Sequence, residues 1–235
     1  GVTASADFTM YGGKISGNHA GTDARHEDGA GVEVGGTFTM YGGTITDNHV
    51  EKRLNYGGGG VVVSGGGEFI MYDGEISHNT SNDDGGGVSV VGASFEMHGG
   101  TISGNTATGS GGGVGLWNHS FTLSGGTISN NTAKGDGGGV YFSGMSSSSN
   151  TLTISDTVEI RGNSAANGGG VYLKSKNLKM TGGSIINNNA TNSGGGVYFN
   201  GDTFNVSGNV SITGNKGGAT STGSGLTGGT DNNVY

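Results

Sequence analysis

The chain has 235 residues, of which 56 are Gly, and it contains neither Pro nor Cys. Its formal net charge is −8, with ten Lys and Arg against eighteen Asp and Glu, so it lacks the clustered positive charge that nucleic acids and anionic membranes require. The absence of Cys removes disulfides and thiolate metal sites, and no apolar run approaches the roughly 20 residues that span a bilayer. We therefore expect no nucleic-acid partner, no membrane insertion of this segment, no cofactor and no metal.

One short motif recurs eight times along the chain: an Ile followed three residues later by an Asn, in Gly-rich surroundings. Successive Asn residues lie 30, 31, 26, 26, 32, 25 and 27 residues apart. Such spacing is typical of a solenoid, in which one structural unit is repeated. The eight Asn residues are Asn18, Asn48, Asn79, Asn105, Asn131, Asn163, Asn188 and Asn215.

Each repeat contains three short segments in which apolar and polar residues alternate. In the cleanest unit these segments are residues 88–90, 95–97 and 101–103. Alternation with a period of two predicts strands with one buried face. Three strands and three tight corners account for about 26 residues, so each unit is expected to form one coil. The predicted fold is an all-β, right-handed, single-stranded parallel β-helix of about eight three-strand coils.

The same alternation predicts which side chains form the core. In the second unit these are Val32, Val34, Phe38, Met40 and Ile45, and equivalent residues recur in every coil. Paired and tripled Gly residues mark the corners, where positive φ or close backbone contact is needed. The sixth and eighth coils lack the paired Gly, and their Val158 and Val210 are expected to turn inward.

The Asn of every coil falls at one corner. A carboxamide both donates and accepts, and the coil spacing suits contact with the Asn residues above and below. We therefore predict a continuous Asn ladder along the rod. A role for these residues as sugar ligands is the alternative.

The repeats resemble those of bacterial parallel β-helix surface proteins, including the polymorphic outer-membrane family and large surface proteins of gut Gram-positive bacteria. The segments that carry the resemblance are residues 101–107 followed by 111–114, and 127–133 followed by 137–142. Nearly the whole chain shows this alternation of an Asn-ended motif with a Gly-Gly-aliphatic motif. The first motif ends in Ile-x-x-Asn where the outer-membrane family often has Phe, which favours the Gram-positive relatives.

The resemblance implies an extracellular protein, on a bacterial cell surface or secreted. Its expected role is an adhesin passenger or a structural stalk that binds a host or microbial surface glycan or a protein receptor. Residues 1–235 are expected to form a single β-helix domain cut from a longer surface protein, because both ends read as interrupted repeats. Uncapped coils would also allow self-association from end to end.

Two sets of residues are candidates for binding. Loops after the Asn corner of the first three coils carry charges that should be neighbours, where they could bind a divalent cation or an acidic or sugar ligand; the alternative is a solvated edge that keeps the rod soluble. These residues are Asp23, Arg25, His26, Glu51, Arg53, Asp83 and Asp84. The second set shares one outward position in the first four coils and comprises Tyr11, Tyr41, Tyr72 and His98.

Such outward aromatic side chains could bind sugars, or they could stabilise the parallel strands by stacking on one another. A further column contains Tyr141, Tyr172 and Tyr198, and Trp117 is interpreted as a lone exposed side chain at a corner.

A polysaccharide lyase or glycoside hydrolase of the β-helix fold, acting on an acidic polysaccharide, is the alternative function. Paired carboxylates in such hydrolases need a fixed separation across the sugar bond. Here only Asp83 and Asp84 form a pair, and they lie in a loop. No catalytic residue is assigned, and binding is favoured over catalysis.

Overall fold

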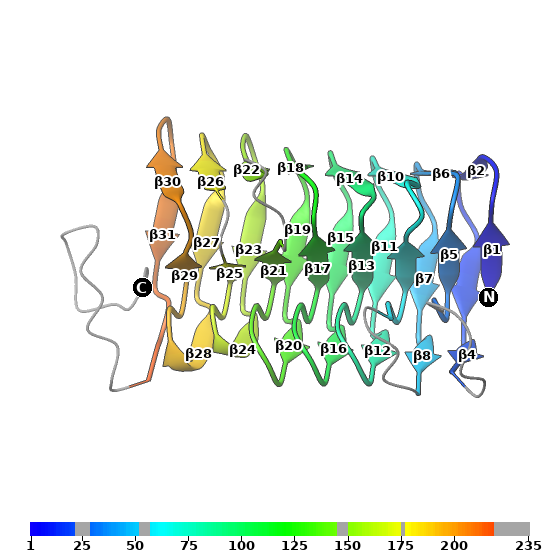
Figure 1. Cartoon of the computed structure of the whole chain (residues 1–235), viewed down its shortest axis with the longest axis horizontal. Coiled ribbons are helices and arrows are strands. Elements are labelled where there is room, and N and C mark those ends of the chain that lie inside the picture. Colours follow the sequence, from blue (N-terminus) through cyan, green and yellow to red (C-terminus); the bar gives the residue numbers. More distant parts are fainter. Residues whose placement is uncertain (22–28, 52–56, 145–149, 175–176, 219–235) are drawn as a thin grey trace.

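The chain folds into a rod of stacked coils in which every strand runs parallel to its equivalent in the next coil (Figure 1). A computed structural model describes residues 1–21, 29–51, 57–144, 150–174 and 177–218. These residues contain strands and turns and no helix, so none of them forms a helix that could cross a bilayer. The all-β parallel solenoid is thereby confirmed. Its right-handed winding stays a prediction.

Three of the sheets contain eight strands, one from each coil. The first sheet contains β1 (Val2–Ala4), β5 (Val32–Val34), β9 (Val61–Val63), β13 (Val88–Val91), β17 (Val114–Trp117), β21 (Val140–Ser143), β25 (Val171–Lys174) and β29 (Val197–Asn200). The second contains β2 (Phe8–Met10), β6 (Thr37–Met40), β10 (Glu68–Met71), β14 (Ser94–Met97), β18 (Phe121–Leu123), β22 (Thr151–Ile154), β26 (Asn177–Met180) and β30 (Thr203–Val206). The third contains β3 (Lys14–Ser16), β7 (Thr44–Thr46), β11 (Glu75–Ser77), β15 (Thr101–Ser103), β19 (Thr127–Ser129), β23 (Glu159–Arg161), β27 (Ser184–Ile186) and β31 (Ser211–Thr213).

A fourth sheet of seven strands lies directly after the Asn corner, so the coil has four sides where the sequence predicted three. Most of its strands have only two residues, too few to show a period of two. In most of these strands the second residue is small and buried, as in Ala107 and Ala133, and it faces the interior. The strands are β4 (His19–Ala20), β8 (His49–Val50), β12 (Thr80–Ser81), β16 (Thr106–Ala107), β20 (Thr132–Ala133), β24 (Ser164–Asn167) and β28 (Asn189–Ser193).

The core consists of columns of identical or similar side chains. Val32, Val34, Phe38, Met40 and Ile45 are all fully buried, as the alternation predicts. Each buried aliphatic or aromatic side chain of this size contributes about 1.5–3 kcal/mol through the hydrophobic effect. The column of Phe rings is continuous through the first four coils, with neighbouring centroids 4.8–5.1 Å apart.

Of the two Val residues expected to turn inward, Val158 does so and Val210 does so only in part. Val158 is 1% exposed and belongs to the core, whereas Val210, in the last coil, is only partly buried against it.

Close approach of the backbone explains the third Gly of each triplet. A Cβ atom on Gly113 would lie 2.7 Å from the carbonyl oxygen of Gly139 and 2.9 Å from Nδ2 of Asn131. Any side chain would therefore push two coils apart. At the paired-Gly corner, Gly is needed because the backbone adopts a positive φ, which is 95° at Gly43. The tip of the Met10 side chain fills the space beside Gly43.

The eight Asn side chains form an unbroken ladder, and seven of them are buried. Within it, Oδ1 of Asn131 accepts hydrogen bonds from both the backbone N and Nδ2 of Asn105. Nδ2 of Asn131 donates to the carbonyl oxygen of Ile102 and to Oδ1 of Asn163. Each inner carboxamide thus uses all four of its hydrogen-bonding positions inside the protein, which gives these residues a structural role.

The residue before each ladder Asn has a left-handed backbone. In four coils it is Gly, and in the others it is Asp47, His78, Asn130 or Asn187, with φ between 54° and 58°. Asn and Asp tolerate this conformation well, whereas His78 is less suited to it. Three of these larger residues cover a Gly in the next coil, as the ring of His78 covers Gly104.

Candidate functional site

Four aromatic side chains form a row along one corner of the rod, and we call this row the aromatic rail. Its members occupy one position, immediately after the second-sheet strand of each of the first four coils: Tyr11, Tyr41, Tyr72 and His98. They are held in register because the backbone N of each later residue donates, over 2.8 Å, to the carbonyl oxygen of the Met one coil earlier. Consecutive ring centroids are 5.2, 5.0 and 5.0 Å apart, with interplanar angles of 7°, 4° and 17°.

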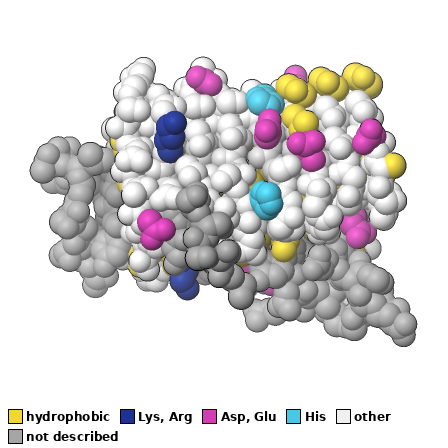
Figure 2. All heavy atoms as spheres, turned by 45° about the horizontal axis from the view of Figure 1, so that its top comes forward, with side chains coloured by type: hydrophobic (Ala, Val, Ile, Leu, Met, Phe, Trp, Pro, Cys, Tyr) yellow, Lys and Arg dark blue, Asp and Glu magenta, His cyan; other side chains and the backbone are white. Residues whose placement is uncertain are grey.

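The rail is exposed to solvent. Tyr11 is 78% exposed, Tyr41 45% and Tyr72 43%, and among the described residues they are three of the four large apolar side chains that are exposed. Figure 2 shows a row of apolar side chains at the edge of one face, ending near a His side chain. Because the rings lie face to face, their inner faces cover one another. What they present to solvent is a row of ring edges and phenol hydroxyls, and no hydroxyl of these three Tyr residues has a partner within the described part of the chain.

His98 ends the rail and connects it to polar neighbours. Its Nε2 lies 3.1 Å from Oε2 of Glu96, and its Nδ1 lies 2.9 Å from Oγ of Ser124, which occupies the next position in the column. Glu96 lies beside Ile70 on the outer face of the second sheet. The carboxylate of Asp73, adjacent to Tyr72, accepts a hydrogen bond of 2.7 Å from the backbone N of Gly74.

The half of the rod that carries the rail is strongly acidic. Residues 1–133 contain thirteen of the eighteen Asp and Glu residues and only four of the ten Lys and Arg residues. Of these four cations the structure describes Lys14, whose Nζ lies 4.0 Å from Oδ2 of Asp47. In Figure 2 acidic side chains gather near the row of apolar side chains, while Lys and Arg side chains lie toward the other end. The rail therefore lies in a field that attracts cations.

A second aromatic stack lies on the outer face of the first sheet and is much less exposed. Tyr141, Tyr172 and Tyr198 stack with centroids 5.4 and 4.8 Å apart, and Tyr172 is only 9% exposed. Trp117 continues the stack at 5.7 Å from Tyr141, and its ring occupies the space above Gly115, where the column has no side chain. The interpretation of Trp117 as a lone exposed side chain at a corner is therefore wrong: it lies in β17 and is 5% exposed.

The burial of Tyr172 affects its acidity. Desolvation, followed by the negative charge of Asp136 and a hydrogen bond with its carboxylate, raises the pKa of Tyr172 well above its ordinary value. Asp136 also accepts a hydrogen bond of 2.8 Å from Nδ2 of Asn167. These contacts join the stack to the loop beside it and support a structural role for this group of residues.

Four of the seven charged loop candidates lie outside the described residues: Asp23, Arg25, His26 and Arg53. Glu51 is half exposed, and its Oε1 lies 3.9 Å from Nδ1 of His19. The rings of His19 and His49 meet edge to face at 5.5 Å, so equivalent positions in the first two coils are indeed neighbours.

Asp83 and Asp84 lie in the turn before β13. Oδ1 of Asp84 accepts a short hydrogen bond from the backbone N of Ser110, so this carboxylate holds the loop of the next coil. Oδ2 of Asp83 is buried without a hydrogen-bond partner. Among the described residues no group of three or more His, Asp or Glu side chains could hold a metal ion.

Part of the chain matches a known family. Residues 125–143 match the model of the Chlamydia polymorphic membrane protein repeat. In the structure this stretch runs from the paired-Gly corner through β19, the ladder residue Asn131 and β20 to β21. The chain is thus similar, over one repeat, to surface-type β-helical proteins. No curated protein and no solved structure matches the chain.

Proposed function

We propose that this chain is part of an extracellular bacterial surface β-helix that acts as an adhesin passenger, with the aromatic rail as its contact surface. The polymorphic membrane protein repeat and the rod-like fold support a surface protein of this type. The Ile-x-x-Asn form of the motif favours relatives among gut Gram-positive bacteria. The ligand is a surface glycan or a protein receptor on a host or microbial cell.

The observation that carries the proposal is that the fold does not need aromatic rings at the rail position. In the last four coils the same position holds Ser124, Ser155, Thr181 and Ser207, and each backbone N makes the same hydrogen bond to the coil before it. Four exposed rings in succession at a corner where Ser suffices are typical of a binding surface, because exposed aromatic side chains are favoured anchors.

A triple variant tests this proposal. Tyr11→Ser, Tyr41→Ser and Tyr72→Ser together replace the rail with the residue that the fold uses in later coils. We expect the variant to keep its circular dichroism spectrum and to lose binding to a glycan array or to cells that the wild-type chain binds. Tyr198→Ser in the half-buried stack is the control, and it should leave binding unchanged. Equal binding by wild type and triple variant would contradict an adhesive role for the rail.

The two other functions predict different outcomes of the same assay. A structural stalk predicts no ligand for either protein. A lyase or hydrolase predicts cleavage of an acidic polysaccharide that is lost in Asp83→Asn or Asp84→Asn. We favour binding because the carboxylate of Asp84 accepts a hydrogen bond from the backbone N of Ser110 in the next coil.

A further inference from the structure

We propose that the aromatic rail binds an extended polysaccharide of β-linked amino sugars whose free amines carry positive charge. This inference rests on the proposed adhesive function and names the chemical class of its ligand. It follows from three properties of the rail: the charge around it, the spacing of its rings and the groups that it presents.

The negative charge around the rail favours a cationic ligand. The first 133 residues contain thirteen carboxylates against four Lys and Arg. Asp73 is adjacent to Tyr72, and Glu96 contacts the His98 ring at the end of the rail. A polyuronate would bring its carboxylates into this field and be repelled, whereas a chain of ammonium groups would be attracted. The same argument disfavours a second copy of this chain, whose rail carries the same acidic surroundings.

The spacing of the rings along the rail favours an extended sugar chain. The rings repeat every 5.0–5.2 Å along the rod. Side chains on one face of an extended peptide recur every roughly 6.6–6.8 Å, so a peptide strand lying along the rail would lose register within a few coils. An extended β-1,4-linked polysaccharide advances by about one pyranose length per sugar, which is close to the coil spacing. Because neighbouring sugars of such a chain face opposite ways, every second sugar can meet every second ring of the rail in an equivalent way.

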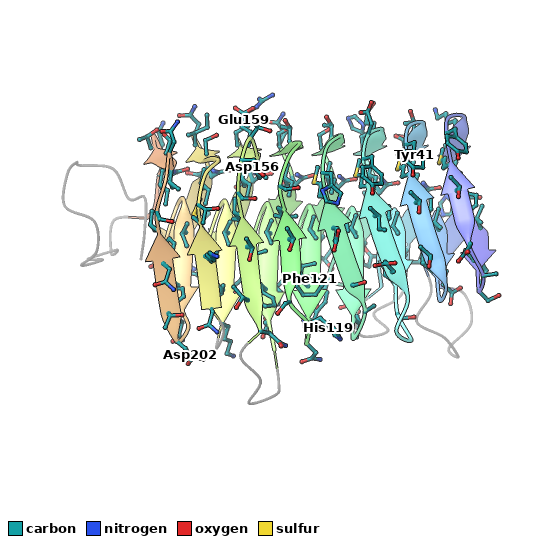
Figure 3. All side chains as sticks on the ribbon, turned by 90° about the horizontal axis from the view of Figure 1, so that it is seen from above. Tyr41, His119, Phe121, Asp156, Glu159 and Asp202 are labelled. Carbon is teal, nitrogen blue, oxygen red and sulfur yellow. The ribbon has the colours of Figure 1, made fainter. Side chains whose placement is uncertain are left out.

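The exposed groups of the rail suit amines better than sugar faces. Because Tyr41 is covered by a parallel ring on each side, a sugar cannot lie flat on it. Its phenol oxygen can accept a hydrogen bond from an ammonium group, and its ring edge can pack against the sugar C–H groups. The neighbouring carboxylates of Asp73 and Glu96 then supply charge-assisted hydrogen bonds. Tyr41 lies near one long edge of the rod (Figure 3), and its side chain is 45% exposed.

Binding by a glucosamine hexamer, compared with its N-acetylated counterpart and an oligogalacturonate, tests the inference. Titration calorimetry with the full chain should detect the glucosamine hexamer, with affinity falling as salt rises, and little or no binding of the other two. Asp73→Asn and Glu96→Gln should each lower the affinity roughly 3- to 10-fold, since each removes one charge and keeps a hydrogen-bonding oxygen. Asp202→Asn is the matched control, because Asp202 lies at the opposite edge near the far end of the rod (Figure 3).

The outcomes separate this inference from the proposed function. Equal affinity for the glucosamine and N-acetylated hexamers, unchanged by Asp73→Asn and Glu96→Gln, would overturn the cationic class and leave the rail as a sugar site. Binding of cells through the rail without binding of any of the three oligosaccharides would overturn the inference alone. Binding of the glucosamine hexamer that survives the triple Tyr variant would place the site elsewhere and overturn it as well.

Discussion

The backbone N and the side-chain Nδ2 of Asn105 both donate to Oδ1 of Asn131, over 2.9 and 3.0 Å. One carboxamide oxygen therefore satisfies two donors of the coil before it, deep in the protein. Asn131→Ala would leave these buried donors unpaired, and we expect it to lower the free energy of unfolding by at least about 3 kcal/mol. Thermal and urea unfolding would measure the loss. Asn205→Ala on the exposed face of β30 is the control, and a similar loss there would contradict a special role for the ladder.

Adjacent Ile residues in β27 test the direction of the side chains. Ile185 is fully buried, whereas its neighbour Ile186 lies on the outer face and is only partly buried. We expect Ile185→Ala to cost about 2–5 kcal/mol of stability through lost burial and a cavity. Ile186→Ala should cost less than about 1 kcal/mol. Equal losses in urea denaturation would show that the strand does not present alternate faces to core and solvent.

Two Gly residues, one in close contact with a neighbouring coil and one with open space around it, test how tightly the coils are packed. A Cβ atom on Gly113 would meet a carbonyl oxygen at 2.7 Å, whereas one on Gly35 would meet nothing within 4 Å. Gly113→Ala is expected to destabilise the protein by several kcal/mol, since the neighbouring coils must separate. Gly35→Ala should be neutral or slightly stabilising, because Ala restricts the unfolded chain. Differential scanning calorimetry of both variants checks this contrast, and a tolerated Gly113→Ala would argue against the coil contacts described above.

His78 is the residue least suited to its backbone conformation. Its φ of 54° lies in the left-handed region, where Asn130 and Asn187 occupy the equivalent positions in other coils. We expect His78→Asn to stabilise the protein by up to about 1 kcal/mol by relieving this strain. The melting temperature would then rise. A fall would mean that packing of the His78 ring over Gly104 outweighs the strain.

Alkaline pH should destabilise the protein through Tyr172. Burial and Asp136 raise the pKa of Tyr172 in the folded state, so the folded protein resists losing this proton more than the unfolded chain does. The stability contributed by the protonated phenol is present below the unfolded pKa of about 10 and is lost as pH rises above it. Unfolding measured from pH 8 to 11 should show this decline. Tyr172→Phe should make the decline shallower, and an identical pH profile would contradict the assignment.

The alternation of apolar residues was enough to predict three sides of the coil and the core residues on them. Val34, Phe38 and Ile45 are all fully buried. The fourth side was missed because strands such as Thr106–Ala107 are too short for any period to be visible. A signal was nevertheless present, since the second residue after the ladder Asn is small and apolar in most coils, as at Ala20 and Ala190.

The candidate site, too, could be predicted from the sequence only in part. Alignment of the repeats places the rail residues in one column, because each follows a second-sheet strand such as Phe38-x-Met40, and the structure has their rings stacked. The burial of Trp117 could not be read from its own position. Gly115, which precedes the inward-facing Leu116, has no side chain. The space that this leaves is filled by the indole ring of Trp117.

Nearly all backbone hydrogen bonds between strands join one coil to the next, and this arrangement has a mechanical consequence. Tension along the axis would peel coils from the end of the rod one at a time. Each released coil of 26 residues, such as that from Asn79 to Asn105, would lengthen from about 4.8 Å to roughly 86 Å when extended at about 3.3 Å per residue. A tether built this way yields in small steps and absorbs a sudden pull.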